Sequence, residues 1–97
     1  MYKSFILPSA RQDINDAAKW YNQKQKGLGK KFTQQLKQKV EFIRKYPHAA
    51  PIRYDQVRTA VVDIFPFMIH YQVDDNKKAI IISAVFHTSQ NPKLWES

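Results

Sequence analysis

Hydrophobic and polar residues alternate over residues 58–87, and two breaks divide this stretch into three segments. The first break contains Phe65 and Pro66, and proline lacks the amide hydrogen of a sheet ladder, so it belongs at a strand end. The second break is the run DDNK at residues 74–77, whose residues favour a tight hairpin turn. Alternation with a period of two is typical of strands with one buried face, so the pattern predicts a three-stranded antiparallel meander.

An even-numbered loop centred on Asp75 and Asn76 determines which side chains of the last two predicted strands share a face. One face is almost entirely apolar and is the predicted core: Phe67, Ile69, Tyr71, Val73, Ile80, Ile82, Ala84 and Phe86. The opposite face is mixed and is expected to be exposed or to face a ligand: Met68, His70, Gln72, Ile81, Ser83, Val85 and His87. Functional residues of the sheet are therefore expected on the mixed face.

Two amphipathic helices are predicted to cover the apolar face. A short apolar run at residues 2–7 reads as a first strand, and Ser9 with Gln12 has the spacing of a capping box at the start of a helix over residues 10–25. Residues 27–29 break this helix, and a second one ends near Tyr46, before Pro47. Both carry apolar stripes at helical spacing: Ile14, Ala17, Ala18 and Tyr21 in the first, and Phe32, Leu36, Val40 and Ile43 in the second.

These elements predict an α+β fold with two layers in the order β-α-α-β-β-β, a helical hairpin lying on one face of a mainly antiparallel sheet. Residues 48–56 are predicted to form a loop between the layers, in which residues 52–54 could add an edge strand. Residues 1–97 are expected to form one domain, because 97 residues with 43% hydrophobic content suffice for one small core.

Composition limits the classes of function. There is no cysteine and the three histidines lie far apart, so we expect no metal and no cofactor. No run of 18 apolar residues and no secretory signal pattern is present, which predicts a cytoplasmic protein without a membrane partner.

Charge is unevenly distributed along this basic protein. The chain has a formal net charge of +8, and residues 9–46 hold ten basic and three acidic residues, a net +7 in the predicted helical hairpin. Such a field attracts nucleic acid, a ribosome or an acidic protein. The alternative is an ordinary solvated, lysine-rich helix face, and the preponderance of lysine over arginine favours it slightly.

The order of elements together with particular residues resembles toxins of the RelE/ParE superfamily of bacterial type II toxin–antitoxin systems, which are often called plasmid stabilisation proteins. The resemblance extends over nearly the whole chain. It is carried by Ala10, Asp13-Ile14, Trp20-Tyr21, Gly27-Leu28-Gly29, Phe32, Leu36, Pro47, Arg58, Phe65-Pro66, Ile69-His70-Tyr71, Ala84-Val85, His87, Pro92 and Trp95.

The resemblance implies a small bacterial toxin that is neutralised by a cognate antitoxin, whose C-terminal segment wraps around it. Contact with operator DNA would then occur only indirectly, through the antitoxin. The target would be DNA gyrase, for ParE-like members, or the ribosome with its messenger RNA, for RelE-like members.

Two residues favour the ParE-like branch, whose members act by binding a protein target. RelE-like nucleases supply a phosphate-stabilising arginine where this chain has Met68, and many relatives have an arginine where it has Gln90. The alternative is a RelE-like, ribosome-dependent mRNA endoribonuclease, and a third possibility is an inert or degraded toxin. Whether the chain is an enzyme therefore stays open, with the prediction leaning towards a binding protein.

Candidate site residues follow from this resemblance and from the mixed sheet face. His87 and Arg58 are the candidates for catalysis. The candidates for contact with the target or the antitoxin are Arg53, Arg58, His70, His87, Gln90 and Lys93. The alternatives are a packed strand histidine for His70 and His87, and a structural salt bridge with Asp63 or Glu96 for Arg58. On the predicted register the two histidines lie about 20 Å apart along the sheet, too far for a dyad.

Overall fold

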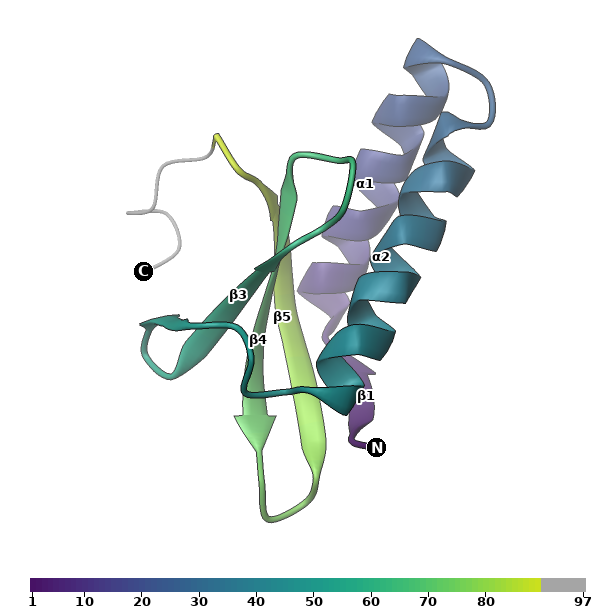
Figure 1. The fold of residues 1–97 in the computed structure, drawn as a ribbon. Helices are drawn as coiled ribbons and strands as arrows, with labels where there is room; N and C mark the ends of the chain where they lie inside the picture. Colours follow the sequence, from purple (N-terminus) through teal and green to yellow (C-terminus); the bar gives the residue numbers. More distant parts are fainter. Residues whose placement is uncertain (90–97) are drawn as a thin grey trace.

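The fold has two layers, a helical hairpin and a five-stranded mixed sheet (Figure 1). The computed structural model describes residues 1–89. The elements in chain order are β1 (Lys3–Ile6), α1 (Pro8–Lys24), α2 (Leu28–Lys45), β2 (Ile52–Tyr54), β3 (Val57–Val61), β4 (Phe67–Asp74) and β5 (Ala79–His87).

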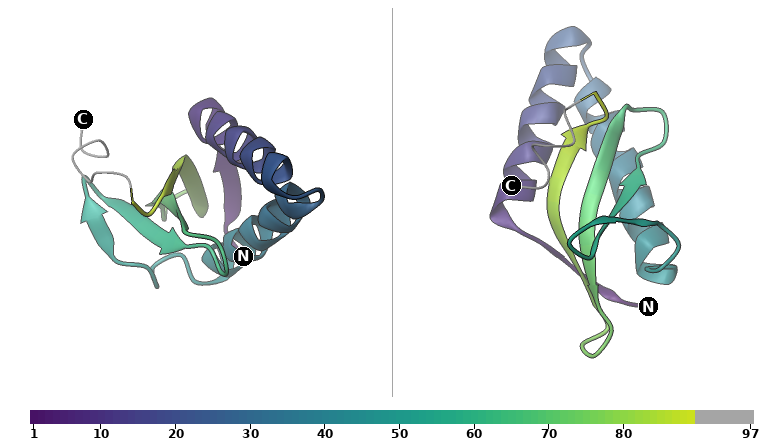
Figure 2. Two further views of the ribbon diagram at one scale, coloured as in Figure 1. Left: turned by 90° about the horizontal axis from the view of Figure 1, so that it is seen from above. Right: turned by 90° about the vertical axis from the view of Figure 1, so that its left-hand side faces the viewer.

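The sheet has the strand order β1-β5-β4-β3-β2. Strand β1 runs parallel to β5, and every other neighbouring pair is antiparallel. Two further views show both helices on the same side of the sheet (Figure 2). The predicted two-layer α+β architecture is confirmed, and the possible edge strand at residues 52–54 is present as β2.

The start of α1 differs from its predicted cap. The helix begins at Pro8, which suits the first helical position because its missing amide hydrogen would have no helical partner there. Leu7 is the N-cap and no side chain caps the helix, so the predicted capping box is wrong. The Ser9 hydroxyl instead donates to the carbonyl oxygen of Ser83, at 3.0 Å.

Two glycines determine how the helices join. Gly27 has a φ of +87°, a left-handed conformation that glycine adopts without a steric penalty. Gly29 lies inside α2, where any side chain would collide with the backbone of Ala18 and the side chain of Asn22. Its amide donates to the Asn22 side-chain oxygen at 2.8 Å, so α1 and α2 approach closely at this end.

The core lies between the helices and the sheet and follows the predicted stripes. Tyr21 and Phe32 pack edge to face against Phe65 and Phe67 at one end, with ring centroids 4.9–6.0 Å apart. The remaining buried members come from the helices, from β4 and β5 and, for Val62, from the residue that follows β3: Ala10, Ala17, Leu36, Ile43, Val62, Ile69, Tyr71, Ile80, Ile82 and Val85.

The predicted faces of β4 and β5 are correct near the turn and wrong beyond Ser83. The loop is centred on Asn76 and Lys77, one residue later than predicted, so the pairing near the turn is shifted by two residues while the faces stay the same. Tyr71 pairs with Ile82, but His70 pairs with Ala84, so Ser83 is an extra residue in β5. Such a bulge moves every following side chain to the other face. The bulge explains the residues whose face was mispredicted: Ala84, Val85, Phe86 and His87.

The consequences of the bulge are visible in the packing. Val85 belongs to the core beneath the helices. Phe86, predicted for the core, packs instead against His70 on the opposite face, with ring centroids 5.1 Å apart. His87, predicted for the mixed face, contacts Phe67 on the helix side, at 5.2 Å between ring centroids.

Candidate functional site

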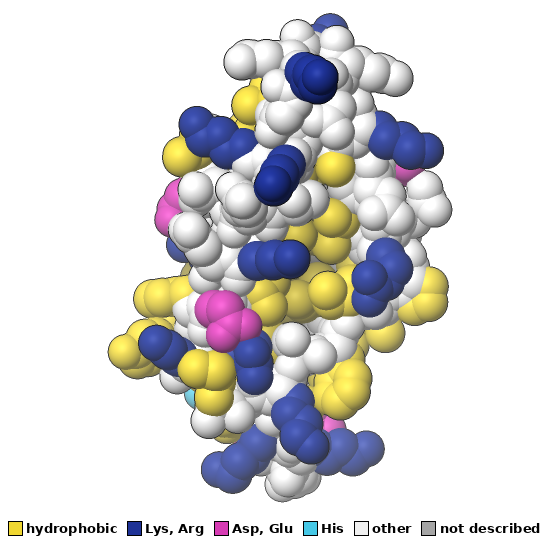
Figure 3. Space-filling view, turned by 90° about the vertical axis from the view of Figure 1, so that its right-hand side faces the viewer, with side chains coloured by type: hydrophobic (Ala, Val, Ile, Leu, Met, Phe, Trp, Pro, Cys, Tyr) yellow, Lys and Arg dark blue, Asp and Glu magenta, His cyan; other side chains and the backbone are white. Residues whose placement is uncertain are grey.

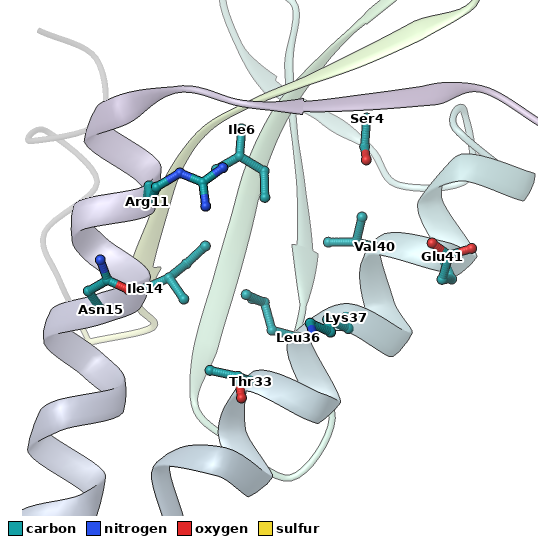
Figure 4. Close-up of a pocket in the computed structure, with 10 residues that line it drawn as sticks. All are labelled: Ser4, Ile6, Arg11, Ile14, Asn15, Thr33, Leu36, Lys37, Val40 and Glu41. Carbon is teal, nitrogen blue, oxygen red and sulfur yellow. The ribbon is translucent and has the colours of Figure 1, made fainter.

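A groove lies between the two helices. Its volume is about 500 Å³. Its floor is apolar and consists of Ile6 from β1, Ile14 from α1, and Leu36 and Val40 from α2 (Figure 4). Because Ile14, Leu36 and Val40 belong to the predicted stripes, the groove is a place where the helices leave their own hydrophobic contact surface partly open.

Basic side chains flank this floor. Figure 3 shows yellow apolar side chains in the hollow with lysine and arginine side chains around it. Arg11 and Lys37 line the groove and are exposed, and Glu41 is the one acidic residue that lines it. Glu41 accepts from Arg44 at 2.7 Å, so its charge is already balanced. An apolar floor with a basic rim suits an amphipathic segment that carries acidic residues beside its apolar ones.

Arg58 lies on β3, where its guanidinium contacts the backbone. Its Nη1 donates to the carbonyl oxygens of Ala50, at 2.6 Å, and His48, at 3.1 Å. Nearby, the buried hydroxyl of Tyr71 donates to the carbonyl oxygen of Pro47 at 2.9 Å. These bonds hold the chain that leads from α2 to β2. The structure does not show the alternative salt bridge between Arg58 and Asp63. The Asp63 carboxylate instead pairs with Lys39, with 3.5 Å between Oδ1 and Nζ.

His70 is fully buried on the sheet face opposite the helices. Its Nδ1 lies 3.0 Å from the hydroxyl of Tyr54 on β2. Burial, and then the positive charge of Arg53, lower the pKa of His70 to about 4. The imidazole is therefore neutral at pH 7, and its place in the packed sheet agrees with the alternative of a structural histidine. Arg53 itself is exposed on β2.

His87 ends β5 at the edge of the helix layer. Its Nδ1 accepts from the backbone amide of Ser89 at 3.1 Å and lies 2.7 Å from the Ser89 hydroxyl. Because Nδ1 is an acceptor, the neutral ring carries its proton on Nε2. His70 and His87 lie on opposite faces of the sheet, so the prediction that they form no dyad agrees with the structure, although the predicted shared face was wrong.

The remaining predicted contact residues, Gln90 and Lys93, lie outside the described residues, as do Pro92, Trp95 and Glu96. Within residues 1–89 no group of histidine and acidic side chains could hold a metal ion. In the same part of the chain no helix is long and apolar enough to cross a membrane.

Sequence reasoning missed three site features. It assigned Ile14, Leu36 and Val40 to the core without expecting a groove, it gave His70 no partner, and it named Asp13 only among the residues that carry the resemblance. The carboxylate of Asp13 accepts from the backbone amide of Val85 at 3.0 Å and so attaches α1 to β5. No local sequence signal could have found these features. In each case the contacting residues lie far apart in the sequence and meet only because the two layers pack together.

Solved toxin structures share this fold. The chain resembles a protein of the chromosomal ParDE toxin–antitoxin system from P. aeruginosa with a TM-score of 0.79 and 18% identity, covering 92% of this chain and 98% of that one. It resembles a chain of the E. coli RelBE toxin–antitoxin complex with a TM-score of 0.70 and 18% identity, covering 94% and 100%. For the isolated E. coli RelE toxin the values are 0.69 and 17%, covering 98% and 93%.

At the level of sequence, the model of one protein family, the ParE toxin of the type II toxin–antitoxin system parDE, matches residues 5–92. No curated protein sequence matches the chain. The family match spans most of the chain, so the chain belongs to the ParE toxin family and is a toxin component of a type II toxin–antitoxin system.

Proposed function

We propose that this ParE-family toxin acts by binding a protein target such as DNA gyrase, and that a cognate antitoxin neutralises it. The family match over residues 5–92 carries this proposal. Two structural observations support the choice of binding over RNA cleavage, and a third supports the antitoxin.

The first observation concerns acid–base groups. Cleaving RNA at a ribose hydroxyl requires proton transfer and a cation at the phosphate. His70 is buried and has a lowered pKa, so it is poorly placed to exchange protons with a substrate.

The second observation concerns the cation that would hold the phosphate. Met68, at the position where the resemblance places a nuclease arginine, is buried and uncharged. The guanidinium of Arg58 is engaged by two backbone carbonyls. The RelE-like alternative is supported by the similarity of this fold to the RelE toxin. The TM-score for that similarity, 0.69, is lower than the TM-score of 0.79 for the ParDE protein.

The third observation is the groove between α1 and α2. An antitoxin segment with apolar side chains would bury the exposed parts of Ile14 and Val40, and its acidic residues would lie near Arg11 and Lys37. The net +7 of residues 9–46 would attract such a segment from a distance.

This part of the proposal is tested with charge reversals on the rim. The double substitution Arg11→Glu and Lys37→Glu should weaken antitoxin binding at least about tenfold, because two attractive contacts become repulsive. Lys30→Glu with Lys45→Glu, two exposed residues outside the groove lining, is the matched control with the same net charge. Equal losses in both variants would show that total charge, and not the groove, governs binding.

The toxin action is tested by expressing the chain without an antitoxin and measuring DNA supercoiling and protein synthesis separately. The proposal expects growth arrest with relaxed plasmid DNA while early protein synthesis continues. Immediate loss of protein synthesis with normal supercoiling would contradict it in favour of the ribosomal target.

A further inference from the structure

A second hollow lies on the opposite flank of α1 from the groove, where α1 packs against the end of β5. It consists of two adjoining cavities of about 300 and 260 Å³ that share Phe67 and His87. Asp13, Asp16 and Ala17 contribute to one cavity, and Trp20 contributes to the other. We refer to both together as the α1–β5 cleft.

The α1 side of the cleft combines carboxylates with an indole ring. Asp13, Asp16, Ala17 and Trp20 have the spacing i, i+3, i+4 and i+7, which places them on one stripe of the helix. Asp13 and Asp16 are two of the three acidic residues in residues 9–46. In a helical hairpin of strongly positive charge, the cleft is therefore a local negative site.

Aromatic side chains line the same cleft. Trp20 is 53% exposed, and the ammonium of Lys24 already lies 4.9 Å from its ring centroid. The ring is thus accessible, and a cation already lies over it at cation–π distance. Across the cleft, Phe67 and His87 pack edge to face.

We propose that the α1–β5 cleft binds an arginine side chain presented by a protein partner. A guanidinium is planar and cationic, so it can stack on an aromatic ring while its N–H groups donate to carboxylates. Phosphate and nucleic acid are disfavoured by the two carboxylates. A metal ion is disfavoured because the described side chains here do not form a metal-binding group.

Both carboxylates can still accept hydrogen bonds from a guanidinium. Asp13 uses one oxygen to accept from the Val85 amide, and Asp16 uses one to accept from the Gln12 side chain at 2.8 Å. An ionised carboxylate offers about four acceptor sites on its two oxygens, so each can take a further N–H. The existing bonds also fix the orientation of the two carboxylates, which reduces the entropy lost on binding.

The cleft is separate from the groove between the helices. The groove takes Arg11, Ile14 and Asn15 from α1, and the cleft takes the residues on the other side of the same helix. A partner in the groove would therefore leave the cleft accessible along this helix, and the proposal does not depend on the identity of the toxin's target.

The test uses the peptide acetyl-Gly-Arg-Gly-amide, titrated into the ¹⁵N-labelled chain and followed by NMR. The control peptide has citrulline in place of arginine, which keeps the shape and removes the charge. We expect saturable shifts at Asp16, Trp20 and His87, with binding about tenfold tighter for the arginine peptide. Equal binding of both peptides, or shifts confined to the groove, would overturn the proposal.

Matched substitutions locate the binding. Asp16→Asn should weaken the arginine peptide about threefold to tenfold, and Trp20→Ala should weaken it by a similar factor. Glu41→Gln removes the third acidic residue of the hairpin, outside the cleft, and should leave binding unchanged. If Glu41→Gln weakens binding as much as Asp16→Asn, the attraction is general electrostatics and the cleft is not a site.

Discussion

Near its turn, the β4–β5 hairpin buries the side chains that alternation assigns to the core, whereas beyond Ser83 it buries the other set. Tyr71 and Ile82 both lie on the helix side as expected, but one extra residue at Ser83 brings Val85 under the helices and moves Phe86 away from them. A period-two pattern therefore defines the faces of a strand only within a continuous ladder. The bulge also brings His87 to the helix side of the sheet, whereas His70 stays on the opposite face.

The largest effect should come from charges placed on the helix side of β5. Ile82→Asp and Val85→Asp should both prevent folding, because each buries a carboxylate in the core at a cost of several kcal/mol. Ile81→Asp is the matched control, since Ile81 is only half-buried and pairs with the exposed Gln72. Circular dichroism and thermal melting are the measurements. A cooperatively folded Val85→Asp protein would contradict the bulge.

A smaller effect should follow from protonation of His70. Its pKa is about 4 in the folded chain and about 6.5 when unfolded, so between these values the unfolded state binds more protons. Stability should therefore be unaffected above about pH 7 and should fall as pH decreases from 6.5 to 4, by about 3 kcal/mol in total. Urea unfolding across this range measures the loss.

The variant His70→Gln isolates this contribution, because glutamine does not titrate and can still bond to Tyr54. We expect the acid-dependent loss to shrink by most of that amount. An unchanged pH profile in the variant would show that His70 is already protonated, or already accessible, in the folded chain.

The smallest effects should come from removing single hydrogen bonds, one made by Tyr71 on the turn side of the bulge and one made by Ser83 at the bulge. Tyr71→Phe leaves the carbonyl oxygen of Pro47 without its 2.9 Å donor and should cost about 1–2 kcal/mol. Ser83→Ala removes a longer bond, 3.3 Å from the Ser83 hydroxyl to the carbonyl oxygen of His70, and should cost less than about 1 kcal/mol. Urea unfolding of both variants gives the order, and a costlier Ser83→Ala would show that the bulge depends on its hydroxyl.

Much of the fold can be predicted from the sequence because helical and strand periods are local. The stripes of Ile14 and Leu36 and the stop before Pro47 agree with the structure. The turn predicted at residues 74–77 is present one residue later, at residues 75–78. The bulge could not be predicted, because Ser83 lies among ordinary strand residues and no glycine or proline marks it.

Less of the candidate site could be predicted. The partners of Arg58 are backbone carbonyls, which have no sequence signature. The groove depends on how closely the helices approach at Gly29, and the cleft depends on the bulge that turns His87 towards α1. These features result from packing between segments that are distant in the sequence, so they cannot be predicted from local patterns along the chain.

We propose that this toxin binds its target and does not cut RNA. The most direct measurement adds the purified chain and its His87→Ala variant to ribosomes programmed with a labelled message, and in parallel to DNA gyrase with relaxed plasmid. The account predicts intact message with both proteins and inhibition of supercoiling that changes by no more than a few fold in the variant. A catalytic histidine contributes about 10² to 10⁴ in rate. Codon-positioned cleavage that disappears in a folded His87→Ala variant would therefore contradict the account.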